Sequence, residues 1–289
     1  MLVFKSRHTL NLYIVAFCAF AAVCYSGCVK QNNIPTYINI NAFSLTTKLN
    51  EGSNSQKITD AWVFLNGISN GVYPLPTTFP VLDTGNVEIV VFPGVRSDGI
   101  KSNPIIYPFY TSYKTNVVAS SEKIYTLKPT ITYNSSVQVG INEDFEHSNT
   151  LSVNRDPVTN VPFTIINNGF EGKSVQATLD ASNPTVEKCT SLRVPIPQSA
   201  NNAYIELNYK TNALLYVGLV ASDAAYSDVS SVYKIALYPN TEWNKTYINV
   251  LDEVRGLNKP YFQIAIKSVK PDSLDKANIF IDNLKLITN

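Results

Sequence analysis

The chain has 289 residues, of which 45% are hydrophobic, 11% aromatic and 16% charged. Its 23 basic and 22 acidic residues nearly cancel, for a net charge of +1, and they form no run of like charges. A chain with this balance lacks the basic surface that polyanions require, so nucleic acid is excluded as a partner.

The first 27 residues differ from the rest. Lys5 and Arg7 precede a mostly apolar run from Leu10 to Val23, and Ser26-Gly27 stand directly before Cys28. This charged, apolar and small-residue order is that of an export signal, and the apolar run is shorter than the roughly 20 residues of a membrane-spanning helix. We predict a signal peptide over residues 1–27. The alternatives are an uncleaved signal anchor and an ordinary signal peptide with no role for Cys28.

The sequence Ser26-Gly27-Cys28 resembles the lipobox of Bacteroidetes-type lipoproteins, with Tyr25 where leucine is usual. The resemblance implies that Cys28 is acylated and becomes the first residue of the mature chain. Several acyl chains on one residue make membrane attachment effectively permanent. Residues 28–35, short and polar, would then be a tether between the lipid and the fold.

Only one cysteine is left for the folded part. Cys18 and Cys24 leave with the signal and Cys28 takes the lipid, so Cys189 has no partner for an intrachain disulfide. A secreted fold without disulfides must be held by its hydrophobic core. We expect Cys189 to be a small buried residue of that core.

Beyond the tether, short alternating runs rich in Val, Ile, Thr and Tyr predict an all-β fold of two antiparallel β-sandwich domains. The first, residues 36–134, has strand patterns at 37–41, 61–65 and 87–91, with Trp62 expected in the core and tight turns at Asn66-Gly67 and Asn70-Gly71. Residues 61–67, 75–76 and 85–89 resemble PEGA-type and carboxypeptidase-regulatory-like domains. The resemblance implies a small Ig- or transthyretin-like sandwich that serves as a spacer or adhesion module.

The second domain, residues 136–289, opens with Asn142-Glu143-Asp144-Phe145-Glu146 and closes with a strand at 279–286 containing Ile281-Asp282-Asn283. Together with Thr241-Glu242-Trp243-Asn244-Lys245, these segments resemble jelly-roll carbohydrate-binding modules, in family order. The resemblance implies a jelly roll in which first and last strands are neighbours. It does not imply a ligand, since many domains of this fold bind no sugar.

The alternation of side chains along one strand also predicts a binding face. In the strand 204–210, Ile205, Leu207 and Tyr209 lie on one face, and Tyr204, Glu206 and Asn208 on the other. Sugar recognition needs aromatic faces together with amide or carboxylate groups. We therefore expect a concave ligand-binding face formed by Tyr204, Glu206, Asn208, Tyr216, Tyr261 and Gln263. The alternative is a plain β surface or a protein-contact face. We expect Trp243, just before a strand, to pack at the core or rim rather than stack on a ligand.

Carboxylates at the chain ends of the second domain suggest a structural calcium site. The jelly-roll resemblance makes the first and last strands neighbours, which would bring Glu143, Glu146 and Asp282 together, and oxygen ligands are what calcium takes. The alternative is a set of ordinary solvated strand ends. No other cofactor is indicated.

Catalytic groups are scarce. The mature chain has one histidine, His147, in a polar stretch, one cysteine besides the acylated Cys28 and no nucleophile-elbow pattern, so a His/Cys metal cluster or a catalytic triad is not expected. The leading prediction is a non-catalytic lipoprotein that binds a glycan or a protein through its jelly roll. The alternative is a structural or assembly lipoprotein of an outer-membrane complex.

The residues after Cys28 indicate on which side of the outer membrane the protein is attached. In Bacteroidetes, lipoproteins sent to the cell exterior commonly carry acids directly after the lipidated cysteine. Here Val29-Lys30-Gln31-Asn32-Asn33 follows, and the first acid is Glu51. We therefore expect attachment to the outer membrane, with the periplasmic face favoured over the cell surface.

The substitution Cys28→Ser should release the protein from membranes without unfolding it, because the anchor and the fold are separate units. Fractionation of cells with metabolic acyl labelling measures this. An unlabelled wild type, or a mutant that stays in the membrane fraction, would contradict the lipoprotein prediction.

Overall fold

The computed structural model describes residues 34–99, 103–227 and 231–289. The predicted signal peptide, Cys28 and nearly all of the tether lie outside these residues. Within the described part of the chain, no helix is long and apolar enough to cross a membrane. The predicted all-β class is confirmed, because strands dominate and the described residues contain one short helix, α2 (Leu251–Leu257).

The sheets divide the chain between Ile131 and Gln138 into two sandwiches. The strands of the first sandwich are β1 (Thr36–Ile40), β2 (Ser44–Leu45), β3 (Asp60–Leu65), β4 (Ile68–Pro74), β5 (Thr77–Val81), β6 (Gly85–Arg96), β7 (Pro104–Ile106), β8 (Tyr113–Ala119), β9 (Ile124–Leu127) and β10 (Thr130–Ile131).

The first sandwich packs a five-stranded sheet, β4-β3-β6-β7 with β8 on β6, against the smaller sheets β5-β1-β9 and β10-β2. Most strand pairs are antiparallel, but β1 runs parallel to β9 and β2 to β10. Asn66 and Gly67, with φ of 49° and 79°, form the two-residue turn between β3 and β4, as the sequence predicts. Alternation places Val87, Ile89 and Val91 of β6 in the core, each 0% exposed.

The second sandwich holds the remaining strands: β11 (Gln138–Glu143), β12 (Val153–Asn154), β13 (Thr164–Ile166), β14 (Ser174–Leu179), β15 (Thr185–Cys189), β16 (Val194–Pro195), β17 (Ala203–Thr211), β18 (Leu215–Ser222), β19 (Val232–Leu237), β20 (Asn240–Asn249), β21 (Tyr261–Val269) and β22 (Ala277–Thr288).

Two six-stranded antiparallel sheets form the second sandwich. One has the order β13-β14-β22-β17-β20 with β11 on β22, and the other β12-β15-β21-β18-β19 with β16 on β21. The first strand, β11, pairs with the last, β22, as the jelly-roll resemblance implies. Cys189 is fully buried, as predicted.

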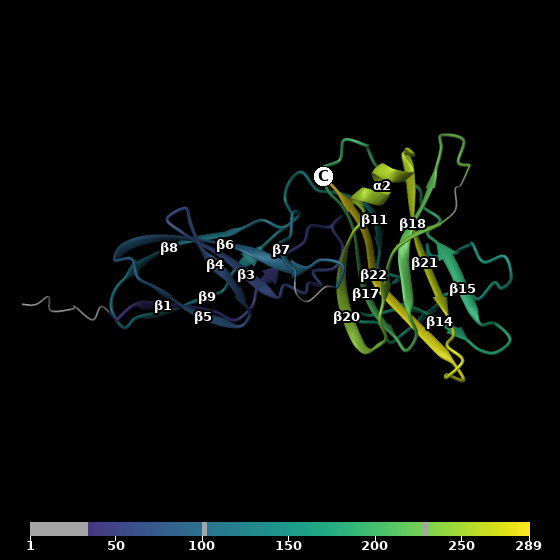
Figure 1. Ribbon diagram of the computed structural model, residues 1–289, viewed down its shortest axis with the longest axis horizontal. Helices are drawn as coiled ribbons and strands as arrows, with labels where there is room; N and C mark the ends of the chain where they lie inside the picture. The colour runs from purple at the N-terminus through teal and green to yellow at the C-terminus, as the bar shows by residue number, and fades with distance from the viewer. Residues whose placement is uncertain (1–33, 100–102, 228–230) are drawn as a thin grey trace, which may run out of the picture.

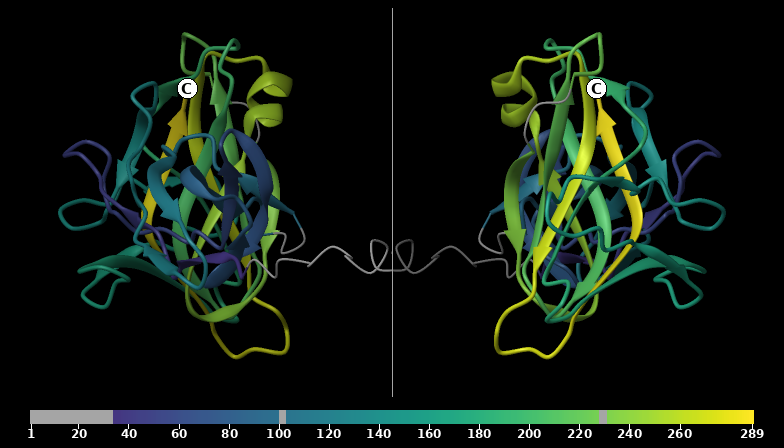
Figure 2. Two further views of the ribbon diagram at one scale, coloured as in Figure 1. Left: turned by 90° about the vertical axis from the view of Figure 1, so that its left-hand side faces the viewer. Right: turned by 90° about the vertical axis from the view of Figure 1, so that its right-hand side faces the viewer.

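The two sandwiches lie end to side (Figure 1). The sheet that contains β17, β20 and β22 faces the first sandwich, and β18 and β21 lie on the far side. Viewed along the long axis, the first sandwich covers part of that sheet (Figure 2). Tyr204, Tyr247 and Ile287 of this sheet belong to the same hydrophobic cluster as the core of the first sandwich. The first sandwich therefore completes its core with side chains of the second.

The expectation that Trp62 lies in the core is wrong. Ala61 and Val63 point inward and are 0% exposed, so the alternation of β3 turns Trp62 outward, where it is half-buried. The continuous apolar run around Trp62 hid this alternation. The outer face of the β4-β3-β6 sheet consequently carries a set of apolar side chains, namely Trp62, Phe64, Val72, Val90 and Phe92.

Candidate functional site

The six side chains predicted to bind a ligand do not share one face. Tyr204, Glu206 and Asn208 lie on β17 in one sheet, whereas Tyr216 on β18 and Tyr261 and Gln263 on β21 belong to the other. The outer faces of two stacked sheets point in opposite directions, so the two groups cannot meet around one ligand. The expectation of a single concave site formed by all six is wrong.

Tyr204, Glu206 and Asn208 do share the outer face of β17, as the alternation predicts, but the first sandwich covers them. Their exposed fractions are 3%, 0% and 1%. The ring of Tyr204 packs edge-on against Tyr107, 5.3 Å away, and Phe109, 5.6 Å away. These three residues therefore join the two sandwiches and are out of reach of an external ligand while the sandwiches stay together.

On the opposite sheet, Gln263 is buried and donates a hydrogen bond to the carbonyl of Thr190. Tyr261 is half-buried and packs against the ring of Tyr226, 5.3 Å away, and Tyr216 packs against Tyr233, 6.1 Å away. A binding role for these side chains stays a prediction.

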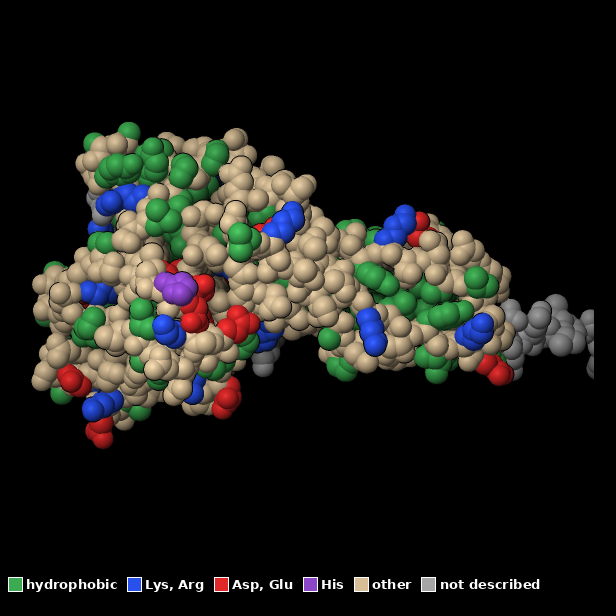
Figure 3. All heavy atoms as spheres, turned by 180° about the vertical axis from the view of Figure 1, so that it is seen from behind, with side chains coloured by type: hydrophobic (Ala, Val, Ile, Leu, Met, Phe, Trp, Pro, Cys, Tyr) green, Lys and Arg blue, Asp and Glu red, His purple; other side chains and the backbone are tan. Residues whose placement is uncertain are grey.

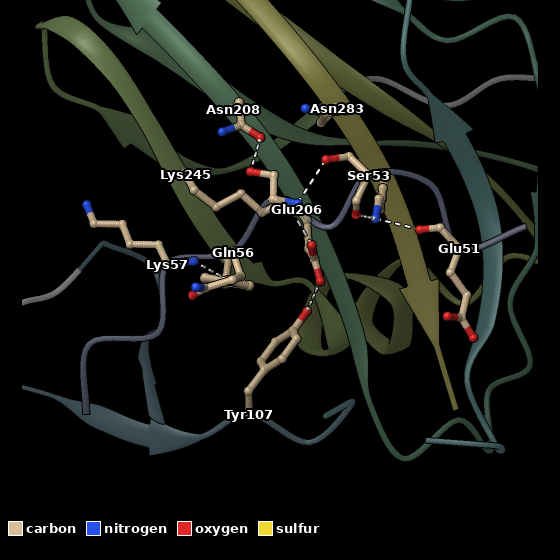
Figure 4. A network of polar contacts seen from close by, with 12 residues as sticks. Glu51, Ser53, Gln56, Lys57, Tyr107, Glu206, Asn208, Lys245 and Asn283 are labelled. Carbon is tan, nitrogen blue, oxygen red and sulfur yellow. Dashed lines mark hydrogen bonds and ion pairs between the residues drawn. The ribbon is translucent and has the colours of Figure 1, made fainter. Parts of the chain in front are cut away.

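A buried ionic cluster stands where the sugar-binding face was expected (Figure 4). Tyr107 donates a hydrogen bond of 2.8 Å to Glu206 Oε1, and Tyr133 donates one of 3.1 Å to the same atom. Lys245 Nζ lies 2.9 Å from Glu206 Oε2. The tyrosines come from the first sandwich and the charged pair from the second. We call Glu206, Lys245, Lys285, Tyr107 and Tyr133 the joint cluster.

Lys285 extends the joint cluster into the loop before β3. Its ammonium group donates hydrogen bonds to the backbone carbonyls of Glu51 at 2.5 Å and Ser53 at 2.9 Å. The same loop reaches the second sandwich through Ser55 Oγ, which donates to Asn208 Oδ1 at 3.0 Å, and through the Lys57 N–H, which donates to the Tyr247 hydroxyl at 2.8 Å. Groups of opposite charge thus lie in contact in the interface, and most of their hydrogen-bonding groups have partners.

The electrostatics of the joint cluster favour an ionised carboxylate. Burial alone would raise the pKa of Glu206, but the ammonium groups of Lys245 and Lys285 outweigh it and hold this pKa below its ordinary value. Burial lowers the pKa of Lys285 to about 8, and Glu206 opposes that shift only in part. Burial also raises the pKa values of Tyr107 and Tyr133, so both phenols stay protonated and act as donors.

The uncovered half of the same face carries aromatic side chains. One cross-strand row runs from Thr164 on β13 through Gln176 on β14 and Phe280 on β22 to Lys210 on β17. Trp243 of β20 stands beside this row, with its ring centroid 6.4 Å from that of Phe280 and 6.3 Å from that of Phe170. We call Phe170, Trp243 and Phe280 the aromatic platform.

The aromatic platform is open to solvent. Phe170 is 42% exposed, and Trp243 and Phe280 are half-buried. Trp243 was expected to pack at the core or rim, and its place is the rim, because it contacts two outward-facing rings rather than the core. The Lys210 ammonium lies 5.7 Å from the Phe280 ring centroid.

Hydrogen-bonding side chains border the aromatic platform. Gln176 Nε2 donates to Thr178 Oγ1 and to Asn278 Oδ1, both at 3.1 Å, and Thr178 Oγ1 donates to Asn278 Oδ1 at 2.9 Å. These amides and this hydroxyl lie at the surface and retain further donor and acceptor capacity. Flat apolar rings beside amides are the combination that covers one face of a pyranose and holds its hydroxyls.

Sequence analysis missed Phe280 and Phe170 as surface aromatics. A signal for Phe280 was available: Ile279 and Ile281 are apolar neighbours in a strand, and burying both turns Phe280 outward. Phe170 lies in a loop between β13 and β14, where no periodicity tells which way a side chain points.

A cleft of about 1020 Å³ lies beside the joint cluster, between the two sandwiches. Lys57, Thr59 and Arg96 line it from the first sandwich, and Tyr209, Asn244 and Tyr247 are among the residues that line it from the second. Its cations are balanced by nearby acids. Arg96 pairs with Asp60 at 2.8 Å and Lys234 with Glu253 at 3.1 Å. The cleft therefore lacks the excess positive charge of a site for anions. On the face shown in Figure 3 the basic side chains are scattered, and several acidic side chains lie together beside the histidine.

The three acids predicted to hold calcium accept hydrogen bonds from backbone N–H groups. Glu143 accepts from Phe145 at 2.9 Å and from Thr150 at 2.8 Å, Glu146 accepts from Lys173 at 2.6 Å, and Asp282 accepts from Glu171 at 3.0 Å. Burial raises the pKa of Asp282 to about 6. Among the described residues, no group of three or more His, Cys, Asp or Glu side chains gathers as a metal site. Structural calcium stays a prediction.

No protein-family model and no curated protein matches the chain. Solved structures similar to it include a carbohydrate-binding module of the β-sandwich superfamily, 15% identical, covering 78% of this chain and 84% of that one with a TM-score of 0.36. The module TmCBM61 in complex with β-1,4-galactotriose is 14% identical, covering 54% and 90% with a TM-score of 0.30. The enzymatically active domain of a bacteriophage tailspike protein is 9% identical, covering 54% and 20% with a TM-score of 0.35. Sequence identities this low do not identify a ligand or a binding site, so the site is judged from its own geometry.

The substitution Glu206→Gln should lower the free energy of unfolding by about 3 kcal/mol or more, because it leaves the buried ammonium groups of Lys245 and Lys285 without their counter-charge. Chemical denaturation at neutral pH measures the loss. The matched control is Glu88→Gln, which removes an exposed pair with Lys114 and should cost at most about 1 kcal/mol. Equal losses in the two variants would show that the buried charge is not what ties the sandwiches together.

The depressed pKa of Lys285 should make stability rise with pH above about 8. Between pH 8 and pH 10 the unfolded chain holds the Lys285 proton and the folded chain releases it, so raising the pH favours the fold, by up to about 3 kcal/mol. Above pH 10 the buried tyrosines reverse the trend, because they ionise only after unfolding. Denaturation curves at several pH values test this. In Lys285→Met the rise should vanish, and a rise that persists would assign it to another group.

Proposed function

We propose that this protein is a non-catalytic, lipid-anchored glycan-binding protein of the outer membrane, facing the periplasm, and that its ligand lies on the aromatic platform. The observation that carries the proposal is the open cluster of Phe170, Trp243 and Phe280 on the outer sheet face, bordered by surface amides. Burying sugar C–H groups on these rings supplies affinity, and the amides of Gln176 and Asn278 supply direction through hydrogen bonds.

The absence of a catalytic arrangement on the platform supports a binding role. Lys210 is the charged residue of the cross-strand row, and its ammonium cannot act with a partner carboxylate as a glycosidase pair does. Asp282 on the same face accepts backbone hydrogen bonds and is 0% exposed. Glu171, next to Phe170 in the chain, accepts hydrogen bonds from the side chains of Ser53 and Asn283.

A structural role in a cell-envelope complex is the second candidate. The apolar side chains on the outer face of β4-β3-β6, including Trp62, Phe64 and Phe92, favour it. Phe64 and Phe92 pack edge-on with ring centroids 5.6 Å apart on this face. Apolar sheet faces of this kind are typical of protein contacts.

Trp243→Ala should weaken glycan binding by about fivefold to a hundredfold, since losing a desolvated aromatic contact costs about 1–3 kcal/mol. The experiment is a glycan array with the mature chain, followed by calorimetry on the hits. Phe280→Ala should act in the same direction.

The matched control is Tyr238→Ala, which removes another exposed aromatic, 79% exposed, from the border of the interdomain cleft. It should leave affinity unchanged. Loss of binding in Tyr238→Ala with none in Trp243→Ala would move the site to the cleft. A folded chain without any array hit would favour the envelope-assembly role.

A further inference from the structure

The end of the first sandwich that lies away from the second one collects exposed aliphatic side chains. The chain enters the fold there, because β1 starts at this end (Figure 1). Three turns meet at the same end: the β3–β4 turn, the β5–β6 turn and the β8–β9 turn. The residues are Ile34, 46% exposed, Ile68, 74%, Leu82, 78%, Val118, 63%, and Ile124, 68%. We call these five residues the apolar tip.

Strand registers place the members of the apolar tip at the same end of the sandwich. Thr36 at the start of β1 pairs with Val81, next to Leu82, and Tyr37 pairs with Ile124. Gly85 pairs with Ala119, next to Val118. The Asn66 side chain donates a hydrogen bond of 2.9 Å to Asp83, which joins the β3–β4 and β5–β6 turns. Ile68 and Leu82 line one shallow hollow of about 610 Å³.

Single exposed aliphatic residues are ordinary on a protein surface, but five at one end of a small sandwich form a patch that calls for a partner. The tether indicates which partner. Six Cα steps separate Cys28 from Ile34, and an extended chain of that length spans at most about 20 Å. A lipid on Cys28 therefore holds the apolar tip within reach of the membrane surface.

We propose that the apolar tip dips into the lipid bilayer beside the acyl anchor and sets the orientation of the molecule on the membrane. This inference rests on the lipid anchor of the proposed function. Aliphatic side chains on the three turns enter the boundary between headgroups and acyl chains, where burial of apolar surface stabilises attachment.

The charge of the apolar tip distinguishes this apolar contact from electrostatic adsorption to headgroups. The three turns carry Asp83, Glu122 and Lys123, so the tip has no positive excess to attract anionic headgroups. Its membrane contact is apolar and, unlike electrostatic adsorption, is insensitive to salt.

The first experiment uses the protein without its lipid anchor. The chain from residue 28 with Cys28→Ser is sedimented with vesicles of phosphatidylethanolamine and phosphatidylglycerol at low and high salt. We expect weak, reversible binding that needs a high lipid concentration and that salt does not reduce. The Cys28→Ser protein therefore still leaves the membrane fraction when cells are fractionated. The triple variant Ile68→Ser, Leu82→Ser and Ile124→Ser should bind at least about tenfold more weakly. The matched control, Leu49→Ser, Val158→Ser and Leu192→Ser, removes three other exposed aliphatic residues and should bind like the parent. Equal loss in both triples overturns the proposal, as does salt-sensitive binding.

The second experiment uses the lipidated protein in vesicles that contain nitroxide-labelled lipid. A fluorophore is attached through Asp83→Cys on the tip or, as a control, through Asp272→Cys on the second sandwich, and buried Cys189 stays unlabelled. We expect quenching at position 83 and little at position 272. Equal quenching at the two positions overturns the tip contact while the anchor stands. If the chain carries no acyl group, the lipid anchor is ruled out, and the sedimentation experiment alone then tests whether the apolar tip contacts the membrane. Self-association that the tip triple abolishes, without vesicle binding by the parent, would assign the tip to a second copy of the chain.

Discussion

Glu206 is a carboxylate with no access to solvent, and the rest of the structure depends on how its charge is satisfied. Lys245 and Lys285, from strands on either side of β17, supply the counter-charge, and two phenols of the first sandwich complete its hydrogen bonds. A buried ionised group is tolerated only when it is paired with opposite charge and hydrogen-bonded, and the partners of Glu206 come from both sandwiches. Separating the sandwiches would strip Glu206 of Tyr107 and Tyr133, and Lys285 of its two carbonyl acceptors. The polar joint therefore specifies one arrangement of the two units, while the rings of Tyr107, Tyr204 and Tyr247 supply apolar contact around it.

The joint cluster divides the outer face of the sheet that contains β17, β20 and β22 into two parts with different chemistry. The half nearer Tyr204 is covered, and its polar groups are used internally. The half nearer Phe280 is open, and its aromatic rings have solvent on one side. The same strands, β17, β20 and β22, contribute to both halves, so the rigid joint also holds the strands that carry Trp243 and Phe280. A preorganised platform loses little conformational entropy when a ligand binds, which suits a site that relies on a few stacking contacts.

The proposed contacts lie on different parts of the molecule. The apolar tip belongs to the outer end of the first sandwich, next to the point where the tether enters, and the aromatic platform belongs to the second sandwich. In the proposed function, the first sandwich separates the binding surface from the lipid. Because the joint cluster fixes the two sandwiches relative to each other, an orientation set at the tip is transmitted to the platform.

Local sequence pattern was sufficient for the β class, the turn at Asn66-Gly67, the burial of Cys189 and the outward direction of Tyr204, Glu206 and Asn208. The burial of Cys189 follows from its residue type, and the other properties follow from the two-residue period of a strand and from turn chemistry, both of which act over a few residues. Local pattern failed at Trp62, where an unbroken apolar run conceals the alternation, and at Phe170, which lies in a loop. It also could not tell that Tyr216, Tyr261 and Gln263 belong to the opposite sheet, or that a second sandwich covers Glu206. Those features depend on contacts between distant residues, such as the hydrogen bond from Tyr107 to Glu206 across 99 positions of the chain. A strand's alternation determines which side chains share a face, and only tertiary packing decides whether that face meets solvent, a ligand or another part of the same molecule.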